Sequence, residues 1–344
     1  MEDFEEIGHS GGKIKINIKG TMFQFEIIHN NINACRIEAV SIPLGDMKLP
    51  VYMVSDKEGY FGAICKGCDK RFRTSGFSDI TTCPYCGIKD SFLNLFTSNQ
   101  VKYIEAYVNK FLELFQSGKS GIIDFDSLIE QMDNKTSFIY NEERQQTIFK
   151  CSRCSNKNDI IGVYGYCSCC GLRNNLTVFN EKLALEMERV INPKYVKNER
   201  HLREKEWQEV LKSSIATFEG FSRDVLEELL KLSMHPIQRK AVGNISFQRI
   251  IEAREVLLKN FQFDIFGNID SGDIKFINKS FNNRHLFTHK EGIVDEDYIK
   301  NTGDSNLKLG QLIRVRSSDV KRIIELLNIV GEKFVYEVDL FDFK

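Results

Sequence analysis

The sequence predicts an α+β protein of three parts: a small β module at residues 1–59, two cysteine-rich ribbons with intervening helices at 60–180, and an α-helical bundle at 195–344. Three observations support this division. Short N-terminal stretches alternate polar and apolar residues, eight of the ten cysteines form two clusters, and long C-terminal stretches repeat apolar residues every three or four positions. A chain of 344 residues can form two or three domains with their own cores.

The composition is that of an ordinary soluble globular chain, with 42% hydrophobic and 28% charged residues. The formal net charge of −1 excludes a basic coat for nucleic acid, so any nucleic-acid contact has to come from a local patch. No stretch of about 18 apolar residues and no secretory signal is found, so no membrane span is expected. Since paired cysteines in such a chain favour reduced thiols, we expect a cytoplasmic location.

The N-terminal part predicts a scaffold or docking module of antiparallel strands. The stretches 13–18, 23–27 and 51–54 alternate polar with β-branched, aromatic or other apolar residues. This period of two is typical of half-buried strands. No catalytic constellation occurs in this part of the sequence.

Two matched cysteine quartets organise the middle of the chain. Each consists of a CxxC pair, a gap of 12 to 14 residues and a second CxxC pair followed directly by glycine. The quartets are Cys65, Cys68, Cys83 and Cys86, and Cys151, Cys154, Cys167 and Cys170. Two short turns joined by a hairpin supply the four thiolates that a tetrahedral Zn²⁺ ion takes. Because such a shell has no open position for a substrate water, the sequence predicts two structural zinc ions.

The two remaining cysteines are expected to play no part in metal binding. Cys169 lies inside the last CxxC pair and could replace a neighbour, but the register with the following glycine favours Cys167 and Cys170. Cys35 lies in a predicted strand and is expected to be a small buried residue. The quartets begin 86 residues apart, which suggests a duplicated unit of a ribbon and a helix.

Basic residues in the first ribbon offer a nucleic-acid contact. Lys70, Arg71 and Arg73 surround Phe72 and could bind phosphates beside one stacking ring. The alternative is that these cations screen the negative charge of a four-thiolate zinc centre and otherwise lie in solvent. The sequence leaves both interpretations open.

Amphipathic helices are predicted on both sides of the second ribbon. One covers the apolar positions from Val101 to Phe115 and ends at Gly118, and a shorter one lies around 128–132. Further on, Ser271 or Asp273 is placed to cap a helix, as is Ser318. The C-terminal stretches with helical periodicity are 207–229, 247–261, 274–281 and 320–334. Four such helices predict a bundle.

The end of the third bundle helix carries a concentration of chemically active side chains. Arg284 can hold a phosphate with a bidentate fork, and the imidazole of His289 can donate or accept a proton. These groups are the minimum for metal-independent RNA cleavage. In a continuous helix, however, residues five apart point about 140° away from each other. The two side chains therefore converge only if the helix ends between them or a second copy completes the site.

This stretch resembles the motif of the HEPN superfamily, in which an arginine next to a polar residue is followed four to six residues on by a histidine, on a four-helix bundle. Arg284, His285 and His289 match it with four intervening residues, and the resemblance covers about residues 205–335. It implies a bundle that dimerises so that two motifs face each other. It also implies that Arg284 binds phosphate, His289 is the acid or base, and His285 orients or assists.

Many HEPN proteins are ribonucleases of toxin–antitoxin, phage-defence and RNA-processing systems. The resemblance therefore predicts a homodimeric, metal-independent endoribonuclease (a hydrolase) acting as an antiviral-defence, toxin or stress effector. Its N-terminal half would recognise RNA, or a protein or phage-derived trigger. Other HEPN domains only dimerise or bind ligands. The alternative is thus a non-catalytic, zinc-dependent adaptor that binds nucleic acid or protein and dimerises through its bundle.

Two further interpretations of the motif remain open. Arg284 and the histidines could form a polar network with the acidic residues at 295–297. His285 and His289 could also form a metal pair with Glu291 or Asp295, although no HExxH pattern is present.

The segment after the motif, 292–310, is expected to be a loop or flap over the site. A short strand at 312–315 would follow it. Arg314 and Arg316 either widen a positive surface there or lie in solvent.

Overall fold

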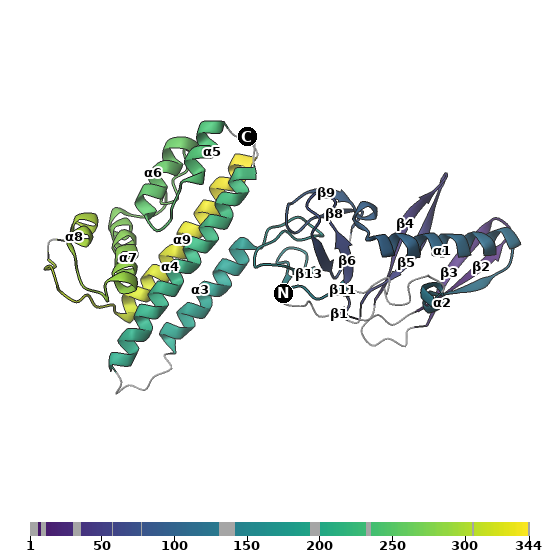
Figure 1. The fold of residues 1–344 in the computed structure, drawn as a ribbon, viewed down its shortest axis with the longest axis horizontal. Coiled ribbons are helices and arrows are strands. Elements are labelled where there is room, and N and C mark those ends of the chain that lie inside the picture. The colour runs from purple at the N-terminus through teal and green to yellow at the C-terminus, as the bar shows by residue number, and fades with distance from the viewer. Residues whose placement is uncertain are drawn as a thin grey trace. The chain divides into compact units, whose positions relative to one another are not determined.

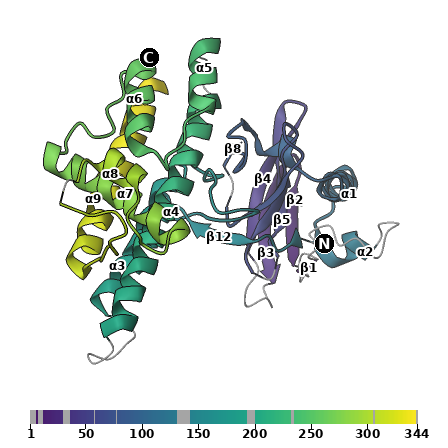
Figure 2. The same ribbon diagram turned by 60° about the vertical axis from the view of Figure 1, so that its left-hand side comes forward.

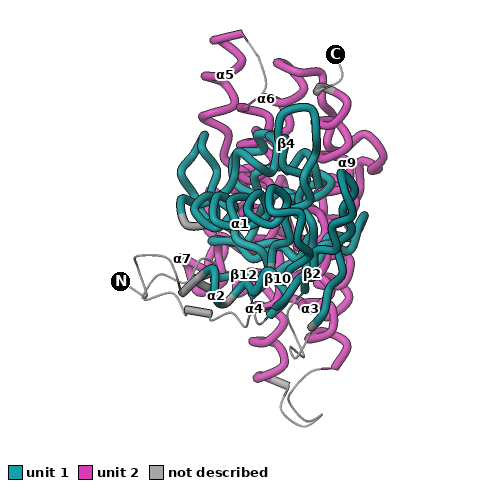
Figure 3. Tube along the Cα trace, turned by 90° about the vertical axis from the view of Figure 1, so that its right-hand side faces the viewer, with its two compact units in different colours: residues 1–174 teal, residues 175–344 magenta. Residues whose placement is uncertain are grey.

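The computed structural model describes residues 6–7, 12–29, 36–56, 58–76, 78–130, 142–192, 200–231, 235–304 and 306–342. It confirms the α+β composition and divides the chain into two compact units, residues 1–174 and 175–344 (Figure 3). The predicted β module and both ribbons thus share the first unit. The helical unit begins at 175 instead of the predicted 195. Cys35, expected to be buried, lies outside the described residues.

Antiparallel strands form at the three N-terminal stretches where alternation predicted them, and a strand from beyond the predicted module joins the sheet that two of them form. β10 (Gly121–Asp124), β2 (Lys13–Lys19) and β3 (Met22–His29) form a three-stranded sheet in that order. β4 (Ile37–Leu44) and β5 (Met47–Val54) pair along their whole length as a hairpin.

Helix α1 (Ser98–Ser117) packs against β5 and β10, and Figure 2 shows it along one side of the strands. The Thr97 side chain accepts a hydrogen bond from the Gln100 N–H, and the Gln100 side chain accepts one from the Thr97 N–H, so a capping box starts the helix. The helix ends where predicted, at Gly118, whose φ of 66° favours glycine. Its buried face carries Tyr103, Tyr107 and Phe111.

The cysteine-rich segments build one continuous four-stranded sheet in the order β12–β13–β7–β6. β6 (Phe61–Ile64) and β7 (Arg71–Thr74) come from the first ribbon, and β12 (Thr147–Lys150) and β13 (Lys157–Ile160) come from the second. The central β7–β13 pair joins the ribbons. The shorter elements are β8 (Ile80–Thr82) paired with β9 (Lys89–Ser91), β1 (Glu6–Ile7) paired with β11 (Glu142–Glu143), the 3-10 helix η1 (Phe92–Leu95) and α2 (Phe125–Glu130).

The second unit is entirely helical within the described residues. Its long helices α3, α4 and α9 contact one another in pairs, and α7 packs on α4 and α9 (Figure 1). Its helices are α3 (Asn175–Ile191), α4 (Arg200–Lys231), α5 (Pro236–Gly243), α6 (Ile250–Phe261), α7 (Ser271–His289), α8 (Glu296–Thr302) and α9 (Ser317–Asp342). None of the described helices is long and apolar enough to cross a membrane.

Helices α4, α6, α7 and α9 correspond to the four C-terminal stretches that periodicity predicted to be helical, and α3 is a further helix that was not predicted from the sequence. Phe179 of α3 stacks on Phe221 of α4 with ring centroids 4.2 Å apart. A Cβ atom on Gly331 of α9 would lie 2.5 Å from the Phe179 ring, so glycine is required where the three helices meet. Asp270 caps α7, because its carboxylate accepts the Asp273 N–H at 2.9 Å, which corrects the predicted caps within the helix.

Candidate functional site

The four CxxC turns share one backbone geometry. In each turn the N–H of the first cysteine donates to the carbonyl five residues on, and the N–H four residues on donates back to the carbonyl of that cysteine. The residue that donates back has a positive φ at all four positions: Asp69 (52°), Gly87 (76°), Ser155 (62°) and Gly171 (73°). Glycine therefore has the expected conformational role in the second turn of each ribbon. In the first turn of each ribbon, Asp69 and Ser155 adopt the same positive φ although they carry a side chain.

The turns bring the eight predicted cysteines together as two groups of four thiols. The sulfur atoms of each group all lie within 4.8 Å of one another. Sγ–Sγ distances are 3.6 Å for Cys65–Cys86 and 3.5 Å for Cys154–Cys167. Ligands about 2.3 Å from a tetrahedral zinc ion lie about 3.8 Å apart, whereas a disulfide bond measures about 2.05 Å. The geometry fits two four-coordinate metal ions, and all eight thiols are free.

The first thiol of each quartet is already biased toward the thiolate that binds metal. Burial raises the pKa of the Cys151 thiol, but the N–H groups of Arg153 and Cys154 and the neighbouring thiols outweigh burial and lower this pKa to about 7. The pKa of Cys65 is lowered by the same balance of burial and hydrogen bonds. Since the thiolate is the ligand form, the lowered pKa of these two thiols favours metal binding.

The two ribbons are related by a local two-fold axis. Arg73 on β7 lies opposite Asp159 on β13, and each stands eight residues after the first cysteine of its ribbon. The second CxxC turns of the two ribbons are related in the same way. In each ribbon, the residue just before the second turn donates its N–H to a carbonyl inside the second turn of the other ribbon. The ribbons therefore pair as two copies of one module.

Arg73 lies at the centre of this pairing and is buried. Its side chain is 1% exposed, and its guanidinium contacts the carboxylates of Asp56, Glu58 and Asp159. The Nε–Oδ2 distance to Asp159 is 2.7 Å, and the guanidinium carbon lies 4.7 Å from the centre of the Tyr60 ring. The prediction that Arg73 binds phosphate at the surface is wrong, because the arginine holds the two ribbons together.

Because Arg73 and Phe72 are both buried, fewer residues of the predicted nucleic-acid contact reach the surface. Phe72 is 0% exposed, so it offers no stacking ring. Lys70 is exposed, with its Nζ 5.0 Å from the centre of the Tyr85 ring, and Arg71 is half-buried. Only Lys70 and Arg71 of the predicted patch reach the surface.

The HEPN-like motif lies on one uninterrupted helix. α7 continues to His289, so it does not end between Arg284 and His289, and helical geometry places these residues about 140° apart. His285 and His289 are both exposed, with ring centroids 4.9 Å apart. The helix thus brings the two imidazoles together but directs the arginine elsewhere.

Arg284 is fixed by a glutamate that sequence reasoning missed. Its Nη2 lies 3.3 Å from Oε2 of Glu219 on α4, with side-chain exposures of 18% and 11%. The other carboxylate oxygen, Oε1, is buried without a hydrogen bond. Burial raises the pKa of Glu219, and the charge of Arg284 and a hydrogen bond from Gln248 oppose that shift. The sequence gives no short-range signal for this pair, because its members are 65 positions apart.

The segment after the motif has its own small core. Leu286, Val294, Tyr298 and Ile313 pack together, and Tyr298 Oη donates to Asn283 Oδ1 at 2.7 Å. In place of the expected strand, an isolated bridge joins Ile293 to Leu312.

Asp295 caps α8 by accepting the Tyr298 N–H at 2.9 Å. Among the described residues, only the two cysteine quartets gather three or more metal-ligating groups. The alternative interpretation, a metal site of His285 and His289 with Asp295 or Glu291, is therefore not found among the described residues.

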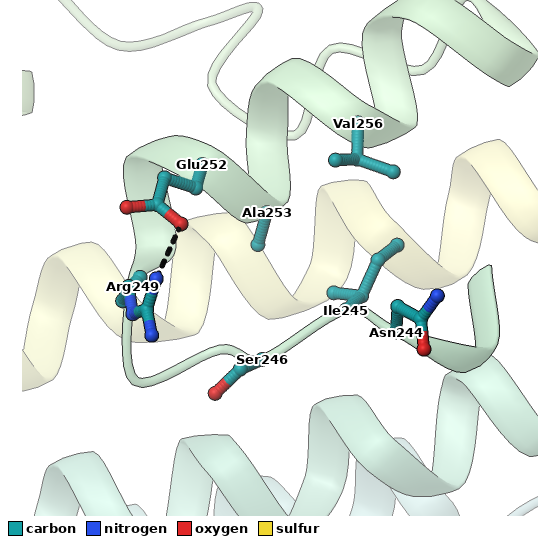
Figure 4. A pocket seen from close by; sticks show the side chains of 7 residues that line it. All are labelled: Asn244, Ile245, Ser246, Arg249, Glu252, Ala253 and Val256. Atoms are coloured by element: carbon teal, nitrogen blue, oxygen red, sulfur yellow. Dashed lines mark hydrogen bonds and ion pairs between the residues drawn. The ribbon is translucent and has the colours of Figure 1, made fainter. Parts of the chain in front are cut away.

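Two pockets in the described part of the chain lie elsewhere on the helical unit. One of about 140 Å³ is lined by residues from the α5–α6 connection and α6, with the Arg249–Glu252 ion pair at its edge (Figure 4). A second of about 350 Å³ lies among the ends of α6 and α9. Neither contains a motif residue.

Replacing Arg284 by alanine is expected to destabilise the helical unit by about 1–3 kcal/mol, because Glu219 then keeps a buried carboxylate without its nearest cation. Urea unfolding followed by helical circular dichroism measures the free energy of unfolding. Arg249→Ala is the matched control, since it breaks an ion pair whose side chains are 73% and 63% exposed, and should cost under about 1 kcal/mol. Equal costs for both variants would show that the Arg284–Glu219 pair adds no stability.

No family model, curated protein or solved structure matches the chain.

Proposed function

We propose that the chain is a metal-independent endoribonuclease of the HEPN type, completed by a second copy of its helical unit. The observation that carries the proposal is the end of α7. There, two exposed imidazoles, His285 and His289, lie side by side, and Arg284 of the same helix is held by Glu219. Exposed imidazoles are accessible to an RNA backbone, and an arginine fixed at one end keeps its fork oriented for a phosphate.

The reaction that suits these groups is internal transesterification of RNA. One imidazole takes the proton from a 2′-hydroxyl, whose oxygen attacks the adjacent phosphorus. Arg284 stabilises the crowded, negatively charged phosphorane, and a second imidazole protonates the 5′-oxygen as the P–O bond breaks. The products are a 2′,3′-cyclic phosphate and a 5′-hydroxyl. We assign His289 as the acid or base and His285 as the residue that orients or assists.

A second copy of the chain supplies the convergence that one helix lacks. Arg284 and His289 point about 140° apart, so each would meet the partner residue of the other copy. The segment following the motif carries exposed apolar side chains suited to such contact: Ile293 at 45%, Leu309 at 57% and Leu312 at 57% exposure. The bridge between Ile293 and Leu312 keeps two of these side chains close together, and exposed apolar area of this kind favours association.

We propose zinc as the metal of both cysteine quartets. Four thiolate ligands without an oxygen or an open position favour a structural Zn²⁺ ion, which cross-links the turns and takes no part in RNA cleavage. The first unit would then recognise the RNA or a protein or phage-derived trigger, with Lys70 and Arg71 as surface contacts.

The test compares wild type with His289→Ala on mixed RNAs, in EDTA applied briefly while circular dichroism checks folding. Removing the acid or base should lower cleavage about 10²- to 10⁴-fold. His201→Ala, which removes an exposed imidazole from α4, should cleave like wild type. Products of the wild type should carry cyclic-phosphate ends. Equal cleavage by wild type and His289→Ala would overturn the assignment.

One observation favours a second function, a non-catalytic adaptor that dimerises through its helices. The ion pair with Glu219 gives Arg284 a packing role that needs no substrate. In that case wild type and His289→Ala give no cleavage, while the chain still dimerises and retains a nucleic acid or protein. A monomer in light scattering at working concentration would contradict both proposals.

A further inference from the structure

We infer that the two cysteine quartets bind metal cooperatively, as one unit, because each ribbon supplies hydrogen-bond partners to the metal-binding turns of the other. This inference is independent of the proposed RNA cleavage. It concerns the contact between the two ribbons. This contact consists of the paired strands β7 and β13 and of hydrogen bonds between the second CxxC turns.

Backbone hydrogen bonds cross between the second turns in both directions. The Thr82 N–H donates to the Ser168 carbonyl at 2.8 Å, and the Tyr166 N–H donates to the Pro84 carbonyl at 2.9 Å. Ser168 lies between the ligands Cys167 and Cys170 of the second quartet, and Pro84 lies between Cys83 and Cys86 of the first. Each acceptor is therefore held in place by a metal-binding turn.

A buried side-chain network adds to this contact. Ser168 Oγ lies 2.8 Å from Thr74 Oγ1 of the first ribbon and 2.7 Å from Asn158 Oδ1 of its own. Asn156 Nδ2 donates to the same Thr74 oxygen at 2.9 Å. Thr74, Asn158 and Ser168 are all 0% exposed, so water cannot replace a lost partner.

A tyrosine hydroxyl inside a turn links the ribbons a third time. Tyr85, between Cys83 and Cys86, accepts the Ile161 N–H at 3.0 Å and donates to the Arg71 carbonyl at 2.8 Å. Its hydroxyl thus spans the end of β13 in the second ribbon and β7 in the first.

Loss of one metal ion would therefore weaken the site that remains. Without its ion, a turn loses the cross-link that holds residues such as Pro84, Tyr85 or Ser168 in position. The facing ribbon is then left with buried polar groups that have lost their partners, which is unfavourable. Because coupling between two sites is reciprocal, each ion should raise the affinity of the other quartet by the same factor.

The test is native mass spectrometry of the full chain, loaded with Zn²⁺ and titrated with a chelator. Two equal, independent sites would give about half of the molecules with one zinc at the midpoint. A coupling of about 10- to 100-fold lowers that species to between about a quarter and a tenth. A one-zinc population of half or more in wild type would overturn the inference.

A double variant, Thr74→Val with Ser168→Ala, tests the side-chain network and should raise the one-zinc population above that of wild type. Ser152→Ala is the matched control, because Ser152 occupies the corresponding position in the first turn of the second ribbon and is exposed. Equal one-zinc populations in the double variant and the control would exclude a role for the network. If the double variant binds no Zn²⁺, the one-zinc population of wild type alone decides whether the two quartets bind metal cooperatively.

Discussion

Removing the metal is expected to unfold the cysteine-rich sheet while leaving the helical unit folded. The ribbons consist of strands of three or four residues, which cannot stand alone without a cross-link. Metal binding to such sites contributes about 10–16 kcal/mol in isolated zinc-finger peptides, far more than these hairpins can supply by packing. The helical unit has its own core, with side chains from α3, α4, α6, α7 and α9, and contains no cysteine quartet.

Hydrogen exchange measured by mass spectrometry separates the two units in one experiment. After chelation, peptides from 58–76 and 144–174 should lose protection, while those from α4 and α9 should keep it. Adding Zn²⁺ back to the chelated sample should restore the pattern, which controls for damage by the chelator. Unchanged protection of both cysteine-rich segments would show that the sheet needs no metal.

Replacing Arg73 by methionine is expected to lower the free energy of unfolding of the first unit by about 3–5 kcal/mol. Methionine fills similar space but leaves Asp56 and Asp159, both 0% exposed, without their cation. Asp159 already has one buried oxygen, Oδ1, without a hydrogen bond. Burial raises the pKa of Asp56, and its hydrogen bonds and Arg73 oppose this shift, so the variant removes part of what keeps that carboxylate charged.

Denaturant unfolding of the first unit, followed by tyrosine fluorescence, measures the loss. The control is Arg71→Met on the same strand, where the side chain is half-buried and the expected cost is under about 1 kcal/mol. Adding Asp159→Asn to Arg73→Met should recover part of the stability, because it removes one of the unpaired charges. A loss no larger than that of Arg71→Met would mean that the buried ion pairs do not hold the ribbons together.

Features set by local sequence were predictable. The CxxC spacing predicted eight thiols that the structure gathers in two groups, because each turn is made by consecutive residues. Helical periodicity predicted α4, α6, α7 and α9, and Gly118 marked the end of α1. These signals need no knowledge of which segments meet.

Features set by contacts between distant segments were not predictable in the same way. Arg73 and Asp159 are 86 positions apart, and Arg73 alone looks like a surface cation. Three consecutive residues of its strand, Phe72, Arg73 and Thr74, are buried. The alternation of buried and exposed positions that is usual in a strand therefore does not identify Arg73 as buried. One signal was available in the sequence. When the two ribbons are aligned on their first cysteines, Arg73 and Asp159 occupy the same position of the alignment, with opposite charges. For Arg284 and Glu219, on separate helices, no such alignment exists.

The opposite charges of Arg73 and Asp159 bear on how the two ribbons came to share one chain. In a symmetric assembly of two identical ribbons, this position on the axis would face its own copy, and two arginines or two aspartates would repel. Only a chain that contains both ribbons can change one copy without the other and place a salt bridge there. The pair is what a duplication followed by divergence would leave, and it matches each ribbon to its neighbour in the chain in preference to an identical ribbon of another molecule.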